Sequence, residues 1–211
     1  MGEKIKKQLV EIAQLMYTKN MVNAYEGNIS FRKGNRVYIT PSAVCKGFLK
    51  TEMIVVTDLE GNKIEGDYKA SSEIKLHLAA YRMRNDIQGV VHAHTPYATA
   101  YALANKPIET NAYPELITLF GSVPLALYGT PSTDEIYQGI GQYIEEHDII
   151  LLANHGIMAV GCDAFDAFFK LEAAESIAKT LFLAEQMGGA KPLPQNKLQE
   201  LYDIKKSAKK S

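Results

Sequence analysis

Gly89-Val90-Val91-His92-Ala93-His94-Thr95-Pro96 combines a short β-branched run with two histidines one residue apart. Side chains alternate between the two faces of an extended strand, so His92 and His94 are expected to project from the same side. Two neighbouring imidazoles can hold one divalent metal ion, and histidine is among the commonest ligands for zinc. The alternative is a half-buried strand end whose histidines only form hydrogen bonds. Other parts of the chain have to distinguish these two interpretations.

The length, charge and cysteine content of the chain limit the kind of protein that it can be. It has 211 residues and a formal net charge of −1, a length that suits a single domain over 1–211 with a short C-terminal tail from about 190. Such a charge gives no general attraction to nucleic acid or to anionic membranes. Cys45 and Cys162 are too few for a disulfide framework, and no long apolar span or signal-peptide pattern is present. These features favour the cytoplasm.

Short strands and turns are predicted before the histidine stretch. An amphipathic first helix is expected from apolar residues at helical spacing: Ile5, Leu9, Ile12, Ala13 and Met16. Strands are predicted at the end of 24–31, at 37–40 and at 53–57, with tight turns at 33–36 and 60–62. Short strands joined by hairpins imply a mostly antiparallel sheet.

Helices and strands alternate after residue 70. A helix is expected to open at 70–73, with Ser71 or Ser72 as the N-cap. The further predicted elements are a helix from Pro96 to about Leu103, a strand at 123–127, a helix from the cap residues 132–135 towards His147, a strand at 148–153, and a helix from about Asp163 to Met187. The tail has room for one short helix.

His155 is the third candidate metal ligand. It follows a buried strand and precedes a glycine, much as His92 and His94 occupy the end of theirs. Neighbouring strands that end at one edge of a sheet could bring three imidazoles together. Catalytic zinc typically takes three protein ligands and leaves one position open.

Glu73 is the acidic candidate. In the first turn of a helix it could simply be a capping residue. The functional interpretation makes Glu73 a fourth metal ligand or a general base, which would remove a proton next to a carbonyl while the metal stabilises the resulting enediolate. His77, one helical turn later, is interpreted as a packing residue.

Small polar turns could enclose a phosphate group. Hydroxyl groups and free N–H groups at a helix start suit an anion. The candidate residues are Gly27, Asn28, Ser42, Ala43, Ser71 and Ser72. The implied substrate is a small phosphorylated carbonyl compound.

At these residues the sequence resembles the class II aldolase family of L-fuculose-phosphate aldolase and its relatives. The matching pieces are Glu26-Gly27-Asn28-Ile29-Ser30, Ile39-Thr40-Pro41-Ser42, Ser71-Ser72-Glu73, His92-Ala93-His94, Tyr113 and Asn154-His155-Gly156. They follow the order and spacing of the family across about 5–190.

The resemblance implies a three-layer α/β/α sandwich around a central, mainly antiparallel sheet, assembled as a homotetramer with sites at subunit interfaces. One Zn²⁺ per subunit, or another divalent metal, would be held by His92, His94 and His155, with Glu73 as a ligand that moves off to act as base or acid. The phosphate of dihydroxyacetone phosphate would lie among the six residues of the small polar turns. Tyr113 would reach a neighbouring subunit's site and exchange a proton with the aldehyde oxygen.

The implied function is a zinc-dependent aldolase that cleaves a ketose 1-phosphate, such as L-fuculose 1-phosphate, into dihydroxyacetone phosphate and a short aldehyde through a metal-stabilised enediolate. A pentulose-5-phosphate 4-epimerase or a methylthioribulose-1-phosphate dehydratase on the same scaffold is the alternative. An adducin-like interaction module and a generic zinc hydrolase are also open to test.

Two departures from the family pattern affect the phosphate turns. Ala43 replaces the usual glycine, so a backbone with φ > 0 would be strained there. Glu26 places a carboxylate near the expected phosphate, which would weaken binding unless Glu26 points away or Lys46 or Lys69 offsets its charge.

Overall fold

The centre of the computed structural model, which describes residues 2–130, 133 and 135–208, is an eight-stranded sheet in the order β4-β3-β2-β1-β5-β8-β7-β6. All neighbouring strands in this described sheet are antiparallel except β6 and β7, which are parallel. The strands are β1 (Asn28–Lys33), β2 (Arg36–Ile39), β3 (Val55–Thr57), β4 (Lys63–Glu65), β5 (Gly89–Ala93), β6 (Leu125–Ala126), β7 (Ile149–Leu152) and β8 (Gly156–Gly161).

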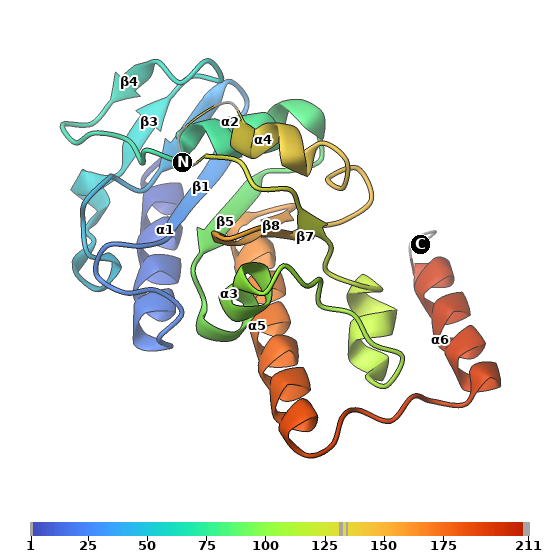
Figure 1. Ribbon diagram of the computed structural model, residues 1–211. Helices are drawn as coiled ribbons and strands as arrows, with labels where there is room; N and C mark the ends of the chain where they lie inside the picture. Colours follow the sequence, from blue (N-terminus) through green and yellow to red (C-terminus); the bar gives the residue numbers. More distant parts are fainter. Residues whose placement is uncertain (1, 131–132, 134, 209–211) are drawn as a thin grey trace.

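Helices cover both faces of the sheet (Figure 1). One face packs against α1 (Gly2–Thr18), α3 (Pro96–Leu103) and α5 (Ala164–Gln186). The other face packs against α2 (Ile74–Met83) and α4 (Glu135–Ile140). The last helix, α6 (Gln195–Ala208), lies apart from the sheet against the π-helical turn Leu116–Phe120. The expected α/β/α sandwich with a mainly antiparallel sheet is confirmed.

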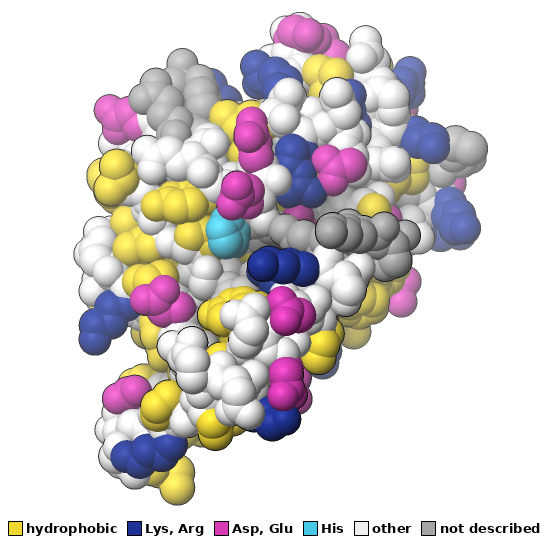
Figure 2. Space-filling view, turned by 90° about the vertical axis from the view of Figure 1, so that its right-hand side faces the viewer, with side chains coloured by type: hydrophobic (Ala, Val, Ile, Leu, Met, Phe, Trp, Pro, Cys, Tyr) yellow, Lys and Arg dark blue, Asp and Glu magenta, His cyan; other side chains and the backbone are white. Residues whose placement is uncertain are grey.

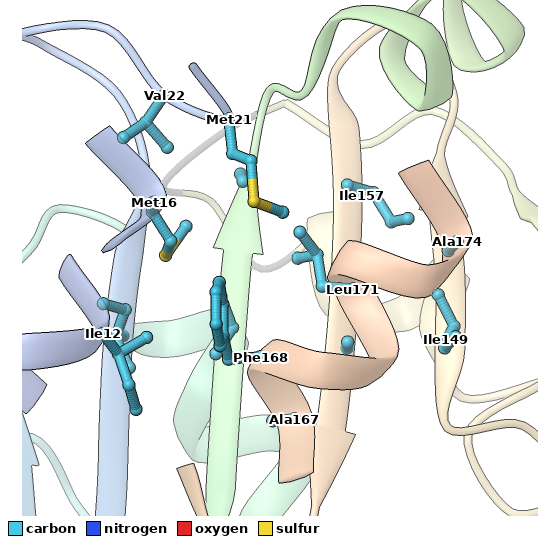
Figure 3. Close-up of a cluster of buried hydrophobic side chains, with 14 of the residues drawn as sticks. Ile12, Met16, Met21, Val22, Ile149, Ile157, Ala167, Phe168, Leu171 and Ala174 are labelled. Carbon is cyan, nitrogen blue, oxygen red and sulfur yellow. The ribbon is translucent and has the colours of Figure 1, made fainter. Parts of the chain in front are cut away.

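The core between the sheet and α5 follows from the spacing of apolar residues. Phe168 and Leu171 of α5 are fully buried, and Ile12 and Met16 of α1 are buried in the same cluster (Figure 3). The five apolar residues that predicted the first helix are all buried in α1. Side chains on one stripe of each helix therefore form the apolar layer on this face.

Alternation along β5 and β1 separates apolar from polar side chains. Val91 packs in the core on the α1 and α5 face, whereas Val90 packs in the core on the α2 face. His92, two residues after Val90, therefore points to the α2 face. Because β1 pairs with β5 so that Asn28 lies opposite His92 and Ser30 opposite Val90, these two polar residues face α2 as well.

Three sequence predictions need correction. The helix expected to open at 70–73 begins at Ile74, and Glu73 takes the N-cap position in place of either serine, although the Glu73 N–H donates to Ser71 Oγ at 3.3 Å. Strand β8 was not predicted, although it pairs with both β5 and β7. The helix expected to run towards His147 ends at Ile140 and turns follow it; its expected cap residues Ser132 and Asp134 lie outside the described residues.

The surface has short sheet edges and mixed charge. At one edge, β4 has three residues, all exposed, and at the other edge β6 has two. Glu65 of β4 pairs with Lys6 of α1 at 2.5 Å and with Arg36 at 3.7 Å. Acidic and basic side chains are interspersed on the face that Figure 2 shows. None of the helices described has both the length and the apolar character needed to cross a bilayer.

A buried polar chain joins β1 to α2. Ser30 Oγ lies 2.7 Å from His77 Nδ1 and 2.6 Å from the Tyr81 hydroxyl, and all three side chains are buried. Burial lowers the pKa of His77 to about 3. The ring is therefore neutral at ordinary pH, and its hydrogen bonds offset the cost of burying it.

His77 should make stability depend on pH. The unfolded chain binds a proton on this ring below about pH 6.5, and the folded chain does so only near pH 3. The free energy of unfolding should therefore fall as the pH drops through that window, by up to about 1.4 kcal/mol per pH unit.

We expect His77→Gln, which keeps an N–H donor towards Asn28, to lower stability at pH 7 but to flatten this slope. Denaturant unfolding between pH 7 and pH 4, with a chelator present for both proteins, measures the difference. Equal slopes for the two proteins would contradict the neutral buried ring.

Candidate metal centre and substrate cavity

The three candidate histidines and Glu73 converge at one end of the sheet. His92 is the next-to-last residue of β5, His94 directly follows that strand, His155 lies between β7 and β8, and Glu73 precedes α2. One ligand atom from each of the four residues can be chosen so that all lie within 4.8 Å of one another. The four residues predicted from the sequence therefore lie close together in the fold, although about 80 positions separate Glu73 from His155 in the chain.

The distances within the cluster are short. The imidazole centroids are 5.0 Å apart for His92 and His94, 4.7 Å for His92 and His155, and 4.8 Å for His94 and His155. His92 Nε2 lies 3.1 Å from His94 Nε2. The two carboxylate oxygens of Glu73 lie 3.2 Å from His92 Nε2 and 3.0 Å from His155 Nε2.

Strand β7, which ends before His155, was expected to lie next to β5. It does not, because β8 lies between β5 and β7. The convergence comes instead from the start of β8. Ala93 pairs with Ile157, which places Gly156 beside His94. A Cβ atom on Gly156 would lie 2.6 Å from His94 Cδ2, so only glycine leaves room for the rings there.

The donor set fits a divalent metal ion. His92 Nδ1 donates to the Ile157 carbonyl at 2.9 Å, which leaves Nε2 free to coordinate. Glu73 Oε1 and His155 Nδ1 are buried without a hydrogen-bond partner, and the contact between Glu73 Oε1 and His155 Nε2 lacks hydrogen-bond geometry. Buried polar atoms without a hydrogen-bond partner need another ligand. A cation such as zinc, which binds both imidazole nitrogens and carboxylate oxygens, would supply it.

The electrostatics keep Glu73 charged. Burial is the largest influence and raises the pKa of the Glu73 carboxyl, but the combined effect of His92 and His155 outweighs it and holds that pKa far below its usual range. Burial, followed by the neighbouring His92 and His155 rings, lowers the pKa of His94 to about 4. A neutral His94 beside an ionised Glu73 is ready to coordinate at neutral pH.

A cavity of about 320 Å³ adjoins the cluster and gathers the six predicted substrate-binding residues. These residues are Gly27, Asn28, Ser42, Ala43, Ser71 and Ser72; Glu73, His94 and His155 line the same cavity. Gly27 has φ +75°, and a Cβ atom there would lie 2.5 Å from Val22 Cγ1. A substituted residue would therefore displace the turn that leads into β1.

The backbone of this cavity corrects one expectation. The N–H groups of Ser42 and Ser71 donate to the carbonyls of Lys69 and Thr40, so they are not free for an anion. The hydroxyl groups of these serines can still donate to an anion, although Ser71 Oγ also accepts from the Glu73 N–H at 3.3 Å. Ala43 has φ +55°, as its replacement of a glycine suggested, and this backbone is strained for a residue with a Cβ atom.

Asn28 contacts Glu73 directly, which sequence reasoning missed. Asn28 Nδ2 donates to Glu73 Oε2 at 2.7 Å, and Asn28 Oδ1 lies 2.5 Å from His77 Nε2. A carboxylate can only accept, so Asn28 must turn its carbonyl towards His77, whose Nε2–H then donates. His77 Nδ1 in turn accepts from Ser30, which makes the buried chain end at Glu73.

Tyr113 does not line this cavity. It is partly buried in the loop before the π-helical turn and packs against the core that α1 and α5 share. Tyr113 therefore does not contribute to the cavity of the chain to which it belongs.

We expect His92→Ala to weaken zinc binding by more than about 100-fold, because removal of a direct ligand should cost at least as much as loss of a partner that only orients a ligand. Elemental analysis and zinc titration of the purified protein provide the measurement. His147→Ala, the same substitution outside the cluster, is the control and should keep its metal. Similar metal loss in both variants would argue against the site.

Comparison with known proteins places this geometry in a family. Residues 7–182 match the family described as Class II Aldolase and Adducin N-terminal domain. An L-fuculose phosphate aldolase of Methanocaldococcus jannaschii is 37% identical over 183 residues, covering 84% of this chain and 96% of that protein. A solved L-fuculose 1-phosphate aldolase structure has a TM-score of 0.87 and 31% identity, with 95% of each chain covered.

A relative that is named as an epimerase, and not as an aldolase, is also similar to this chain. The L-ribulose-5-phosphate 4-epimerase UlaF of Salmonella paratyphi C is 29% identical over 201 residues, covering 89% of this chain and 88% of that protein. The cluster of three histidines and Glu73 is typical of the metal site in class II aldolases. The chain therefore belongs to the class II aldolase and adducin N-terminal domain family, as one of its metal-dependent enzymes.

Proposed function

We propose that this protein is a zinc-dependent aldolase that cleaves a ketose 1-phosphate, L-fuculose 1-phosphate or a similar sugar, into dihydroxyacetone phosphate and a short aldehyde. The observation that carries this proposal is the position of the Glu73 carboxylate, which belongs to the histidine cluster and lines the same cavity as Ser42, Ser71 and Ser72. Such a carboxylate can exchange a proton with a carbon beside a carbonyl group.

The residues divide the reaction between them. His92, His94 and His155 would hold the zinc ion together with Glu73, and the ion when bound supplies a Lewis acid that polarises the substrate carbonyl. In the direction of condensation, Glu73 takes a proton from the hydroxymethyl carbon of dihydroxyacetone phosphate. The electron pair left on that carbon forms the new bond to the aldehyde carbon, and the aldehyde oxygen takes a proton. Cleavage follows the same steps in reverse.

Asn28 positions Glu73 for this exchange. Its amide holds Oε2 at 2.7 Å, while Oε1 lacks a hydrogen bond. The carboxylate thus has one oxygen anchored and one available. Asn28 was also predicted to bind the phosphate, and it lines the cavity at the start of β1.

A homotetramer with sites at subunit interfaces is part of the proposal. Tyr113 lies outside its own chain's cavity, as a residue that serves a neighbouring site would. Several large apolar side chains are also exposed in the isolated chain, as is common where subunits meet. They include Leu103, Leu119, Leu127, Tyr128 and Met187.

A retro-aldol assay over a set of ketose 1-phosphates, read by release of dihydroxyacetone phosphate, tests the reaction. We expect Glu73→Gln to lower kcat by about 10²- to 10⁴-fold, the usual contribution of a general acid or base, while metal stays bound. Glu60→Gln, the same change at an exposed turn, should keep full activity.

Epimerisation of a pentulose 5-phosphate without any release of dihydroxyacetone phosphate would replace the aldolase proposal by the epimerase alternative. Dehydration of methylthioribulose 1-phosphate would favour the dehydratase alternative in the same way. Activity retained by Glu73→Gln after loss of metal would contradict the role given to Glu73.

Tyr113 is tested by mixing two inactive variants. Tyr113→Phe removes the proposed proton donor, and Glu73→Gln removes the proposed base. If Tyr113 serves a neighbouring subunit, co-assembled subunits should regain activity at about a quarter of their sites, as random assembly predicts. Mixed assemblies that stay inactive would place both groups in the same chain's site or exclude Tyr113 from it.

A further inference from the structure

Lys46 is a buried lysine on the wall of the substrate cavity. It begins the short 3₁₀ turn Lys46–Phe48, which follows the turn of Ser42 and Ala43 after Val44 and Cys45, and is only 3% exposed. Among the described residues that line the cavity, Lys46 is the one lysine or arginine. Lysine side chains are almost never fully buried unless an opposite charge pairs with them.

The ammonium group of Lys46 has no such partner in the part of the chain described. Its Nζ donates to the Val44 carbonyl at 2.9 Å, and no carboxylate of the described residues lies within 4.0 Å of it. The two carboxylates that line the cavity are directed to histidines instead. Glu26 Oε1 lies 3.4 Å from His94 Nδ1, and Glu73 lies between His92 and His155.

The surroundings of Lys46 favour an anion as the missing partner. The N–H groups of Ser42 and Ser71 are used by backbone hydrogen bonds, so the serines offer hydroxyl groups but no charge. Burial lowers the pKa of Lys46, an effect that the neighbouring Cys45 only partly opposes. A negatively charged group in the cavity would stabilise the ammonium form.

We propose that Lys46 is a specificity-determining residue whose ammonium group binds the phosphate dianion of the substrate, so that the cavity selects phosphorylated ketoses over unphosphorylated ones. This inference rests on the proposed function in that it takes the substrate to be a sugar phosphate. Lys69, the other lysine near these turns, has an exposed side chain that does not line the cavity.

Binding of inorganic phosphate, measured by calorimetry, tests Lys46 without any need for turnover. The variants are Lys46→Met, which keeps the apolar stem, and Lys69→Met, the same loss of charge at the exposed position. We expect Lys46→Met to lower phosphate affinity about 10- to 100-fold, as for loss of a hydrogen bond to a charged group, and Lys69→Met to change it less than about threefold. Equal affinities for Lys46→Met and the parent protein would overturn the proposal.

Steady-state kinetics provide a second readout. Lys46→Met should raise KM for the ketose 1-phosphate by a similar factor with kcat nearly unchanged, and Lys46→Arg should recover part of the affinity. If Lys46→Met does not fold, Lys46→Gln, which keeps a donor towards Val44, takes its place. A loss confined to kcat, with KM unchanged, would refute a role in phosphate binding.

The outcomes separate the two proposals. A parent protein that binds phosphate through Lys46 but releases no dihydroxyacetone phosphate from any ketose phosphate would refute the aldolase reaction and keep the role of Lys46. An active aldolase whose phosphate affinity and KM do not depend on Lys46 would keep the reaction and refute the role of Lys46.

Discussion

The pairing of β5 with β1 on one side and β8 on the other is the constraint on which the site depends. This register sets Asn28 opposite His92 and Ile157 opposite Ala93, so that polar groups from three segments meet at the same end of the sheet. A shift of one residue would turn these side chains to the α1 and α5 face, where the described residues form an apolar cluster. Packing of Val90 and Val91 on opposite faces therefore protects the register.

A second consequence of this pairing is that Glu73 belongs to a buried network rather than to an isolated helix start. Tyr81 contacts Ser30, Ser30 contacts His77, His77 contacts Asn28, and Asn28 contacts the carboxylate. The carboxylate can only accept, so the Asn28 amide donates to it. Asn28 then accepts from His77, and His77 accepts from Ser30. The cost of burying these groups is offset only while the network is complete.

Local patterns predicted much of the fold and of the site, and the failures have physical causes. Helical spacing and hairpin turns predicted α1, β1 and β2, and a histidine at each of two strand ends was enough to suggest the metal cluster. Strand β8 was missed because the turn at 153–155, where Asn154 has φ +55°, was interpreted as the end of a strand and not as the turn of a hairpin. The contact between Asn28 and Glu73, and the burial of Lys46, depend on packing between distant segments that local spacing does not encode.

The two ends of the sheet limit how copies of the chain can meet. A strand of three exposed residues that carries Lys63 and Glu65 at one end, and a strand of two residues at the other, leave few unpaired backbone groups in a row. Such edges resist the addition of a foreign strand and so protect the protein against β-aggregation. In the homotetramer proposed above, the subunits are therefore expected to meet through helices and loops, with each subunit keeping its own hydrogen-bonded sheet.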